Sequence, residues 1–258
     1  MKVMYYSLVA VFFSMVTVVG CSEDSSGPDS YSESGQGGSM ARFTIAGDYL
    51  YTVDDRTMKT FSLEEPSQPK YLKEKDQNLG FGIETIFVMD TLLFVGSQDG
   101  MHIYNISRPA FPQFVSTTSH IRSCDPVVAS GQYAYVTLNS SGLWCGRTSN
   151  VLQVYDISDP YHPELAVPEI RLVSPRGLGV DGNLLFVCDN GLKVYDISDP
   201  EKPVWNDDLS EIPEASGIDA YDVIPYRGVL LLTGKDGFYQ FDYTGEKLKF
   251  LSKIPVAG

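Results

Sequence analysis

The chain has 258 residues, of which 43% are hydrophobic and 20% charged, and this composition is typical of a folded globular protein. The formal net charge of −14 argues against a nucleic-acid-binding role, because an acidic surface repels phosphates and no cluster of Lys or Arg offsets it. Sixteen Tyr and thirteen Phe favour a sheet-rich interior, and the length allows one large all-β domain or two small ones.

The first residues, 1–20, have the pattern of a bacterial lipoprotein signal peptide. Lys2 gives a positive start, and a mostly apolar run over 3–19 follows it. The run ends in VVGC (18–21), which resembles a lipobox, a motif in which the chain is cut before the Cys and the thiol is acylated. We therefore predict that Cys21 is lipidated and anchors the mature chain to the membrane. A plain secretory signal with an incidental Cys is the alternative.

Residues 21–38 are predicted to form a disordered acidic tether. The segment after Cys21 reads SEDSSGPDSYSESGQGG, and such a run of Ser, Gly and acids buries too little surface to offset the entropy of ordering. Glu23 and Asp24, directly after the Cys, resemble the export signal of surface lipoproteins in Bacteroidetes-type bacteria. This resemblance implies an outer-membrane anchor facing the cell surface, with a periplasm-facing anchor as the alternative. One folded domain is expected over 39–258.

A repeat organises this domain. The seven residues VYDISDP occur twice, ending at Pro160 and at Pro200. Five related apolar runs recur at intervals of 43, 41, 51 and 46 residues, with first aligned residues Tyr49, Leu92, Tyr133, Leu184 and Leu230. Each is followed by a second strand-like run: TMKTFSL, GMHIYNI, NVLQVYDI, GLKVYDI and GFYQFDY. A period in the forties without a helical pattern predicts an all-β fold, a five-bladed β-propeller of four-stranded antiparallel blades.

Prolines predict which strand lies outermost in each blade. Four repeats carry two prolines three residues apart: Pro66/Pro69, Pro109/Pro112, Pro160/Pro163 and Pro200/Pro203. Proline lacks the N–H that a central strand needs, so these pairs mark the turn into an edge strand. The fifth repeat has FDYTGEK in place of this turn. No terminal strand is left over for a shared blade, so we expect closure by packing of blade one on blade five.

With these features the chain resembles the LVIVD-repeat family. The resemblance rests on the YDISDP turns together with GGSMARF (37–43), IETIF (83–87), SCDPVV (123–128) and GLGVDGNLLFVCD (177–189). It extends over essentially the whole mature domain. It implies a bacterial surface or secreted lipoprotein with a propeller-like fold, and it brings no activity that can be assigned to particular residues.

Three cysteines remain after Cys21. Cys145 lies in an insertion over 140–150, between the second and third strands of blade three, and Cys124 precedes the first strand of that blade. In an antiparallel meander these two connections emerge at the same end, so we predict a Cys124–Cys145 disulfide, and closing about 20 residues would stabilise the fold by about 3 kcal/mol. Cys188 is predicted to be a small buried side chain; a Cys145–Cys188 bond is the alternative.

No motif predicts a metal, a cofactor or a catalytic centre. GLGVDG (177–182) matches the dinucleotide-binding fingerprint, but LFVCD follows at once, so Asp181-Gly182 is predicted to be a hairpin turn. The three histidines lack metal-ligand spacing and an acidic partner, and we expect them to be structural or solvated: His102, His120 and His162.

Charged residues are expected to converge at the end of the propeller where the first strands begin. The positions eight residues before each second-strand landmark are Ala41, Glu84, Asp125, Arg176 and, with two inserted residues, Asp219. Convergent charges of this kind are a binding-site candidate. The alternative, which we favour, is a self-satisfied ring in which Arg176 and Arg42 neutralise the acids. Trp144 and Arg147, in the insertion at the same end, are better candidates for contacting a partner.

Together these features predict a lipid-anchored cell-surface propeller that acts as a binding or assembly module for an unknown surface protein or glycan. A glycan-processing enzyme is one alternative, because Glu84, Asp125 and Asp219 would supply the two acids about 5–10 Å apart that glycosidases use. A passive structural surface protein is the other.

Overall fold

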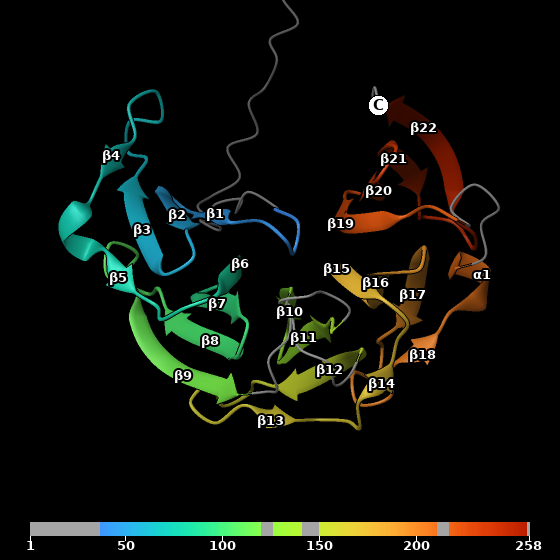
Figure 1. Ribbon diagram of the computed structural model, residues 1–258, viewed down its shortest axis with the longest axis horizontal. Helices are drawn as coiled ribbons and strands as arrows, with labels where there is room; N and C mark the ends of the chain where they lie inside the picture. The colour runs from blue at the N-terminus through green and yellow to red at the C-terminus, as the bar shows by residue number, and fades with distance from the viewer. Residues whose placement is uncertain (1–36, 120–125, 141–149, 211–216, 257–258) are drawn as a thin grey trace, which may run out of the picture. The chain divides into compact units, whose positions relative to one another are not determined.

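The computed structural model describes residues 37–119, 126–140, 150–210 and 217–256. In this part of the chain five antiparallel sheets are arranged around a common centre (Figure 1). Each sheet is a blade whose strands follow one another in chain order from the centre outward. The predicted five-bladed β-propeller of four-stranded blades is therefore confirmed. No helix among the described residues is long and apolar enough to cross a membrane.

The first two blades occupy residues 43–119. Blade one contains β1 (Phe43–Ala46), β2 (Tyr49–Val53), β3 (Thr57–Ser62), β4 (Lys70–Tyr71) and β5 (Gln77–Asn78), with the 3-10 turn η1 (Lys73–Lys75) between the last two. Blade two contains β6 (Ile83–Met89), β7 (Leu92–Ser97), β8 (Gly100–Asn105) and β9 (Gln113–Ser119). Both β4 and β5 pair with β3, so the outer strand of blade one is in two pieces.

The other three blades follow the same plan. Blade three contains β10 (Val127–Ser130), β11 (Tyr133–Leu138), β12 (Val151–Asp156), β13 (Glu164–Leu165) and β14 (Ile170–Arg171). Blade four contains β15 (Pro175–Asp181), β16 (Leu184–Asp189), β17 (Leu192–Asp196) and β18 (Val204–Trp205), followed by the short helix α1 (Asp207–Ser210). Blade five contains β19 (Ala220–Tyr226), β20 (Val229–Gly234), β21 (Gly237–Asp242) and β22 (Lys249–Pro255).

The repeated VYDISDP segment builds the turn into the outer strand. In blade three the Asp156 carboxylate accepts the N–H of Ser158 at 2.8 Å, and the Asp159 carboxylate accepts the N–H of Tyr161 at 3.0 Å. Ile157 between them is buried. β4, β9, β13 and β18 each begin directly after the second proline of a pair. The prediction that the prolines mark the outermost strand is confirmed.

The aromatic residue before each turn holds the outer strand in place. In every blade it lies opposite a large side chain of the outer strand, in the pairs Phe61–Tyr71, Tyr104–Phe114, Tyr155–Leu165, Tyr195–Trp205 and Phe241–Phe250. In blade one the two rings stack with centroids 4.9 Å apart, and in blade two they meet edge to face at 5.6 Å. Such cross-strand pairs stabilise a sheet, so the Tyr of VYDISDP recurs because each blade needs this anchor.

Apolar clusters join each blade to the next. Four clusters of buried side chains lie between blades one and two, two and three, three and four, and four and five. Among the described residues no cluster of this kind joins blade five to blade one. The expectation that closure rests on packing of these two blades is therefore wrong, because neither sheet buries the face that it turns toward the other.

A polar contact at the centre takes the place of that packing. Ser39, just before blade one, donates its hydroxyl to the Asp222 carboxylate of β19 at 3.0 Å and accepts the N–H of Leu178 of β15 at 2.7 Å. The N–H of Met40 adds a bond to Asp222 at 3.3 Å, and the carbonyl of Ala41 accepts the N–H of Ile86 in blade two. The short segment 38–41 thus connects blades two, four and five.

Glycines of the GLGVDG segment permit this close approach. A Cβ atom on Gly177 would lie 2.1 Å from Oδ1 of Asp222 and 2.7 Å from its Cα, and one on Gly179 would lie 2.5 Å from Pro225. Gly182, with φ of 54°, forms the turn between β15 and β16, which confirms the predicted hairpin. The motif is therefore explained by packing of β15 against β19.

Gly177→Ala is expected to lower the free energy of unfolding by about 1–3 kcal/mol, because the added methyl meets the backbone of Asp222 and the neighbouring strand must shift. Gly245→Ala is the matched control: its Cβ would meet nothing closer than the Lys247 carbonyl at 3.7 Å. Urea unfolding of both variants measures the difference, and equal stabilities would contradict the packing argument.

Candidate functional site: the loop face

The candidate site is the end of the propeller at which the innermost strands begin, which we call the loop face. It comprises the connections into the innermost strands and those between the second and third strands. Its described segments are residues 37–42, 54–56, 79–82, 98–99, 172–174, 190–191, 217–219 and 235–236. The opposite end carries the hairpin turns and the proline turns, whose side chains are occupied in capping the backbone.

Irregularities in three innermost strands present side chains on the loop face. The pairing register shifts between Ile83 and Thr85 in β6, between Pro175 and Leu178 in β15, and between Ala220 and Asp222 in β19. The intervening residues include Glu84, Arg176 and Tyr221. A bulge of this kind leaves a residue unpaired and re-aims its side chain. Two of the predicted ring residues, Glu84 and Arg176, occupy these positions.

Arg176 is held in a fixed orientation by three groups of blade five. Its Nη1 lies 2.6 Å from Oδ1 of Asp219 and donates to the carbonyl of Ala220 at 3.1 Å. Its guanidinium lies 4.7 Å from the ring centroid of Tyr221. The side chain remains 31% exposed, so the guanidinium is oriented and still accessible from solvent. An Arg fixed in this way loses little further rotamer freedom when it binds a partner.

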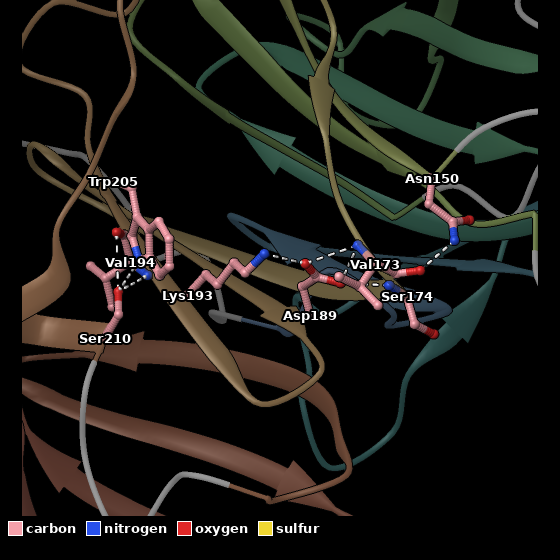
Figure 2. Close-up of polar contacts among 8 residues, drawn as sticks. All are labelled: Asn150, Val173, Ser174, Asp189, Lys193, Val194, Trp205 and Ser210. Carbon is pink, nitrogen blue, oxygen red and sulfur yellow. Dashed lines mark hydrogen bonds and ion pairs between the residues drawn. The ribbon is translucent and has the colours of Figure 1, made fainter.

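The backbone that carries Arg176 is pinned by blade three. The Thr137 hydroxyl donates to the carbonyl of Arg176 at 2.6 Å, and the Asn139 amide donates to the carbonyl of Pro175 at 2.5 Å. The Asn150 amide donates to the carbonyl of Val173, also at 2.5 Å (Figure 2). The start of β15 is therefore a rigid platform rather than a free loop.

Asp189 fixes the same segment from within blade four. Its buried carboxylate accepts the N–H groups of Val173 at 2.9 Å and Ser174 at 2.6 Å, and it forms an ion pair with Lys193 at 2.7 Å (Figure 2). Lys193 also lies over the ring of Trp205, whose Nε1 donates to the hydroxyl of Ser210 at 2.8 Å. Since each acceptor position of Asp189 is used, the residue is structural, and it supports Arg176 indirectly.

A second pair of an arginine and an aromatic ring lies on the loop face at blades one and two. The Arg56 guanidinium is 5.1 Å from the ring centroid of Phe81. Phe81 is 52% exposed and stands between Gly80 and Gly82, both of which have positive φ. Sequence reasoning missed Phe81 and Tyr221. The signal for Phe81 was the GFG run at 80–82, because two adjacent turn glycines force a lone aromatic outward.

The structure brings some of the predicted site residues together. Arg176 and Asp219 form an ion pair, while Glu84 accepts a bond from the Gln98 amide at 3.2 Å. Ala41 is partly buried and Arg42 is exposed. Several predicted residues lie outside the described part of the chain: Cys21, Cys124, Asp125, Trp144, Cys145 and Arg147.

Histidines and the remaining cysteine show no sign of a metal or reactive centre. His102 contacts the hydroxyl of Thr117 and His162 contacts Asp159, both at 2.8 Å, while His120 lies outside the described residues. Within the ranges that the structure describes, no group of His, Cys, Asp or Glu is arranged to hold a metal ion. Cys188 is a free, buried thiol, as predicted, and burial raises its pKa well above the usual range.

Asp222 is the one carboxyl near the centre whose titration is displaced upward. Burial raises its pKa to about 6, although hydrogen bonds from Ser39, Val223 and Met40 favour the ionised form. The carboxyl therefore titrates close to neutral pH while it holds the contact that joins segment 38–41 to blade five.

These features define the chain as a five-bladed β-propeller with a charged and aromatic loop face. The family model of the LVIVD repeat matches residues 121–167 and 175–206, which include both copies of VYDISDP. The chain therefore carries LVIVD repeats in blades three and four, in agreement with the resemblance in its sequence. No curated protein sequence matches the chain.

Solved structures share the fold at low sequence identity. A functionally unknown protein from Desulfotomaculum acetoxidans aligns with a TM-score of 0.65 and 13% identity, over 84% of this chain and 70% of that protein. AztD from Citrobacter koseri aligns with a TM-score of 0.59 and 12% identity, over 81% and 61%. Hsv2 from Kluyveromyces lactis aligns with a TM-score of 0.52 and 12% identity, over 81% and 60%. At these identities the likeness establishes the fold alone.

Asp222 is expected to make stability depend on pH. Between the usual pKa of 3.8 and the folded value of about 6 the folded state binds the proton more tightly, so the free energy of unfolding falls as the pH rises through this window. Relative to Asp222→Asn, the native chain should lose up to about 3 kcal/mol between pH 4 and pH 7. Urea unfolding at several pH values measures this, and a pH-independent difference would contradict it.

Proposed function

We propose that this protein is a lipid-anchored binding or assembly module of a bacterial cell surface, with its partner bound on the loop face. The partner is a surface protein or a glycan. The single observation that carries the proposal is the presence of two arginine–aromatic pairs on one face, Arg176 with Tyr221 and Arg56 with Phe81. Exposed Arg and aromatic side chains that are already ordered are the residue types that contribute most binding energy at interfaces.

The engagement of the acids supports binding over catalysis. A glycosidase needs two carboxyls free to act as acid and base or nucleophile. Asp219 is committed to Arg176 at 2.6 Å, and Glu84 is bonded to Gln98. We therefore place the binding module first, and we do not carry the glycan-processing enzyme further.

The anchor and the disulfide complete the proposal. The signal peptide over 1–20 and the lipobox Cys21 support an outer-membrane lipoprotein, with the acidic residues after Cys21 favouring the cell surface. The predicted Cys124–Cys145 bond would tie the insertion over 140–150 to the start of blade three, on the same face as Arg176. The free thiol of Cys188 agrees with this pairing, since it leaves Cys145 for Cys124.

Cys21→Ser is expected to release the protein from membranes, because no acylated thiol then remains. In a detergent-partition assay the variant should move to the aqueous phase, whereas Cys188→Ala, which changes a buried thiol, should stay with the native protein in the detergent phase. Retention of Cys21→Ser in the detergent phase would refute the lipid anchor.

Substitutions on the loop face are expected to weaken capture of the partner. Arg176→Ala, and likewise Trp144→Ala or Arg147→Ala in the insertion, should each cost about 1 kcal/mol or more, which is the level of a typical hot spot. The measurement is quantitative pull-down from intact cells, with the insertion deleted for comparison.

Arg227→Ala is the matched control for this experiment. Arg227 also lies over a tyrosine ring, that of Tyr226 at 5.2 Å, but at the hairpin turn on the opposite end of blade five. Capture that survives all loop-face changes and is lost in Arg227→Ala would place the binding surface at the other end of the propeller.

A further inference from the structure

The outer strand of blade five differs from those of the other blades. β22 runs for seven residues, Lys249–Pro255, and no proline pair precedes it. β4, β13 and β18 have only two residues each. Short or interrupted outer strands limit the unpaired backbone that a sheet presents to other chains. β22 lacks this protection and presents a long unpaired edge.

The side chains of β22 are exposed and partly apolar. Ile254 is 61% exposed, Leu251 45% and Val256, just beyond the strand, 58%. β9 is the other seven-residue outer strand, but after Phe114 and Val115 its sequence is Ser-Thr-Thr-Ser. β22 therefore combines a long edge with apolar side chains that the described residues do not cover.

The sheet behind β22 is also covered on one face only. Toward blade four it presents buried side chains, among them Leu232, Tyr239 and Phe241. On the face toward blade one no residue of β20, β21 or β22 is buried; Leu231 and Phe238, for example, are half-buried. Ile254 pairs with Phe238 and extends this uncovered face to the outer edge. A further strand beside β22 would add apolar surface where the sheet lacks a neighbour.

Lysines give this edge a charge opposite to that of the chain as a whole. The net charge is −14, yet Lys247, Lys249 and Lys253 follow one another along the outer strand and the turn before it. Lys253 is neutralised by Asp236 at 2.6 Å, whereas Lys247 and Lys249 are exposed. In an antiparallel pair of two β22 strands, lysines would lie near lysines, which opposes self-association. The same lysines attract an acidic strand.

We infer that β22 accepts an extended acidic segment of a partner protein, which adds to blade five as a fifth strand. Main-chain hydrogen bonds supply affinity in strand addition, and alternate side chains supply specificity. Apolar side chains of the partner segment meet Ile254 and Leu251, and its acidic side chains meet Lys247 and Lys249. This surface is separate from the loop face, since it lies on the circumference of the propeller.

Two nine-residue peptides with blocked ends test the inference: one alternates Val and Glu, the other Val and Lys. The full chain, purified in detergent, should bind the Val/Glu peptide about tenfold more tightly than the Val/Lys peptide, since each cross-strand ion pair contributes a fraction of that factor. Fluorescence anisotropy measures the affinities. Hydrogen exchange should show slower exchange of the amides of 249–255 on addition of the Val/Glu peptide.

Charge reversal at the edge provides the decisive comparison. Lys247→Glu combined with Lys249→Glu should abolish or reverse the preference between the peptides. Lys202→Glu, at an 81% exposed side chain in the proline turn of blade four, is the matched control and should preserve it. Failure of both peptides to bind, equal binding of the two, or protection away from β22 would overturn the inference. Self-association through β22, measured by sedimentation, would overturn it in favour of a second copy.

Discussion

A blade of this propeller is a sheet with side chains to bury on both faces, and this constraint governs the whole structure. A sheet in that position needs a neighbour on each side, because apolar surface left in water costs free energy in proportion to its area. Blades two, three and four have two neighbours each, and four apolar clusters fill their interfaces. Blades one and five have one such neighbour each. Their free faces are where the structure departs from a uniform repeat.

The turn and the edge pair meet the same constraint at the circumference. The outer strand has no neighbour beyond it, and a two-residue strand such as β13 or β18 forms few main-chain bonds. The pairing of Tyr155 with Leu165, and of Tyr195 with Trp205, adds side-chain contact where the ladder is short. The carboxylates of the VYDISDP turn bind the N–H groups that the reversal leaves free. The repeated sequence thus corresponds to one local structural requirement.

The architecture was predictable because it depends on periodic features. Tyr49, Leu92, Tyr133 and Leu184, aligned by eye in the sequence, are the first residues of four second strands, and Leu230 misses the fifth by one residue. The proline pairs located the outer strands for a local reason, the missing N–H. Closure was not predictable in this way. It depends on Ser39 and Asp222, which belong to no repeat and lie 183 positions apart.

The candidate site was predictable only in part. The spacing placed Glu84, Arg176 and Asp219 at one end, and the structure joins two of them in an ion pair. Tyr221 and Phe81 were missed, since the bulge in β19 and the positive φ angles around Phe81 are properties of the backbone. The partner that Arg176 would select from several acids is likewise a matter of distances that spacing does not give.

The contact of Ser39 with Asp222 and Leu178 has a consequence for how the chain folds. Most strand pairs in the structure join neighbours in sequence, and such local pairings form early, because little loop-closure entropy opposes them. The bonds of Ser39 instead span 183 and 139 positions, so they wait until blades four and five exist. A chain emerging from the ribosome can therefore build its blades one by one, and segment 38–41 takes its place last. The final folding step is then made by residues near the beginning of the domain.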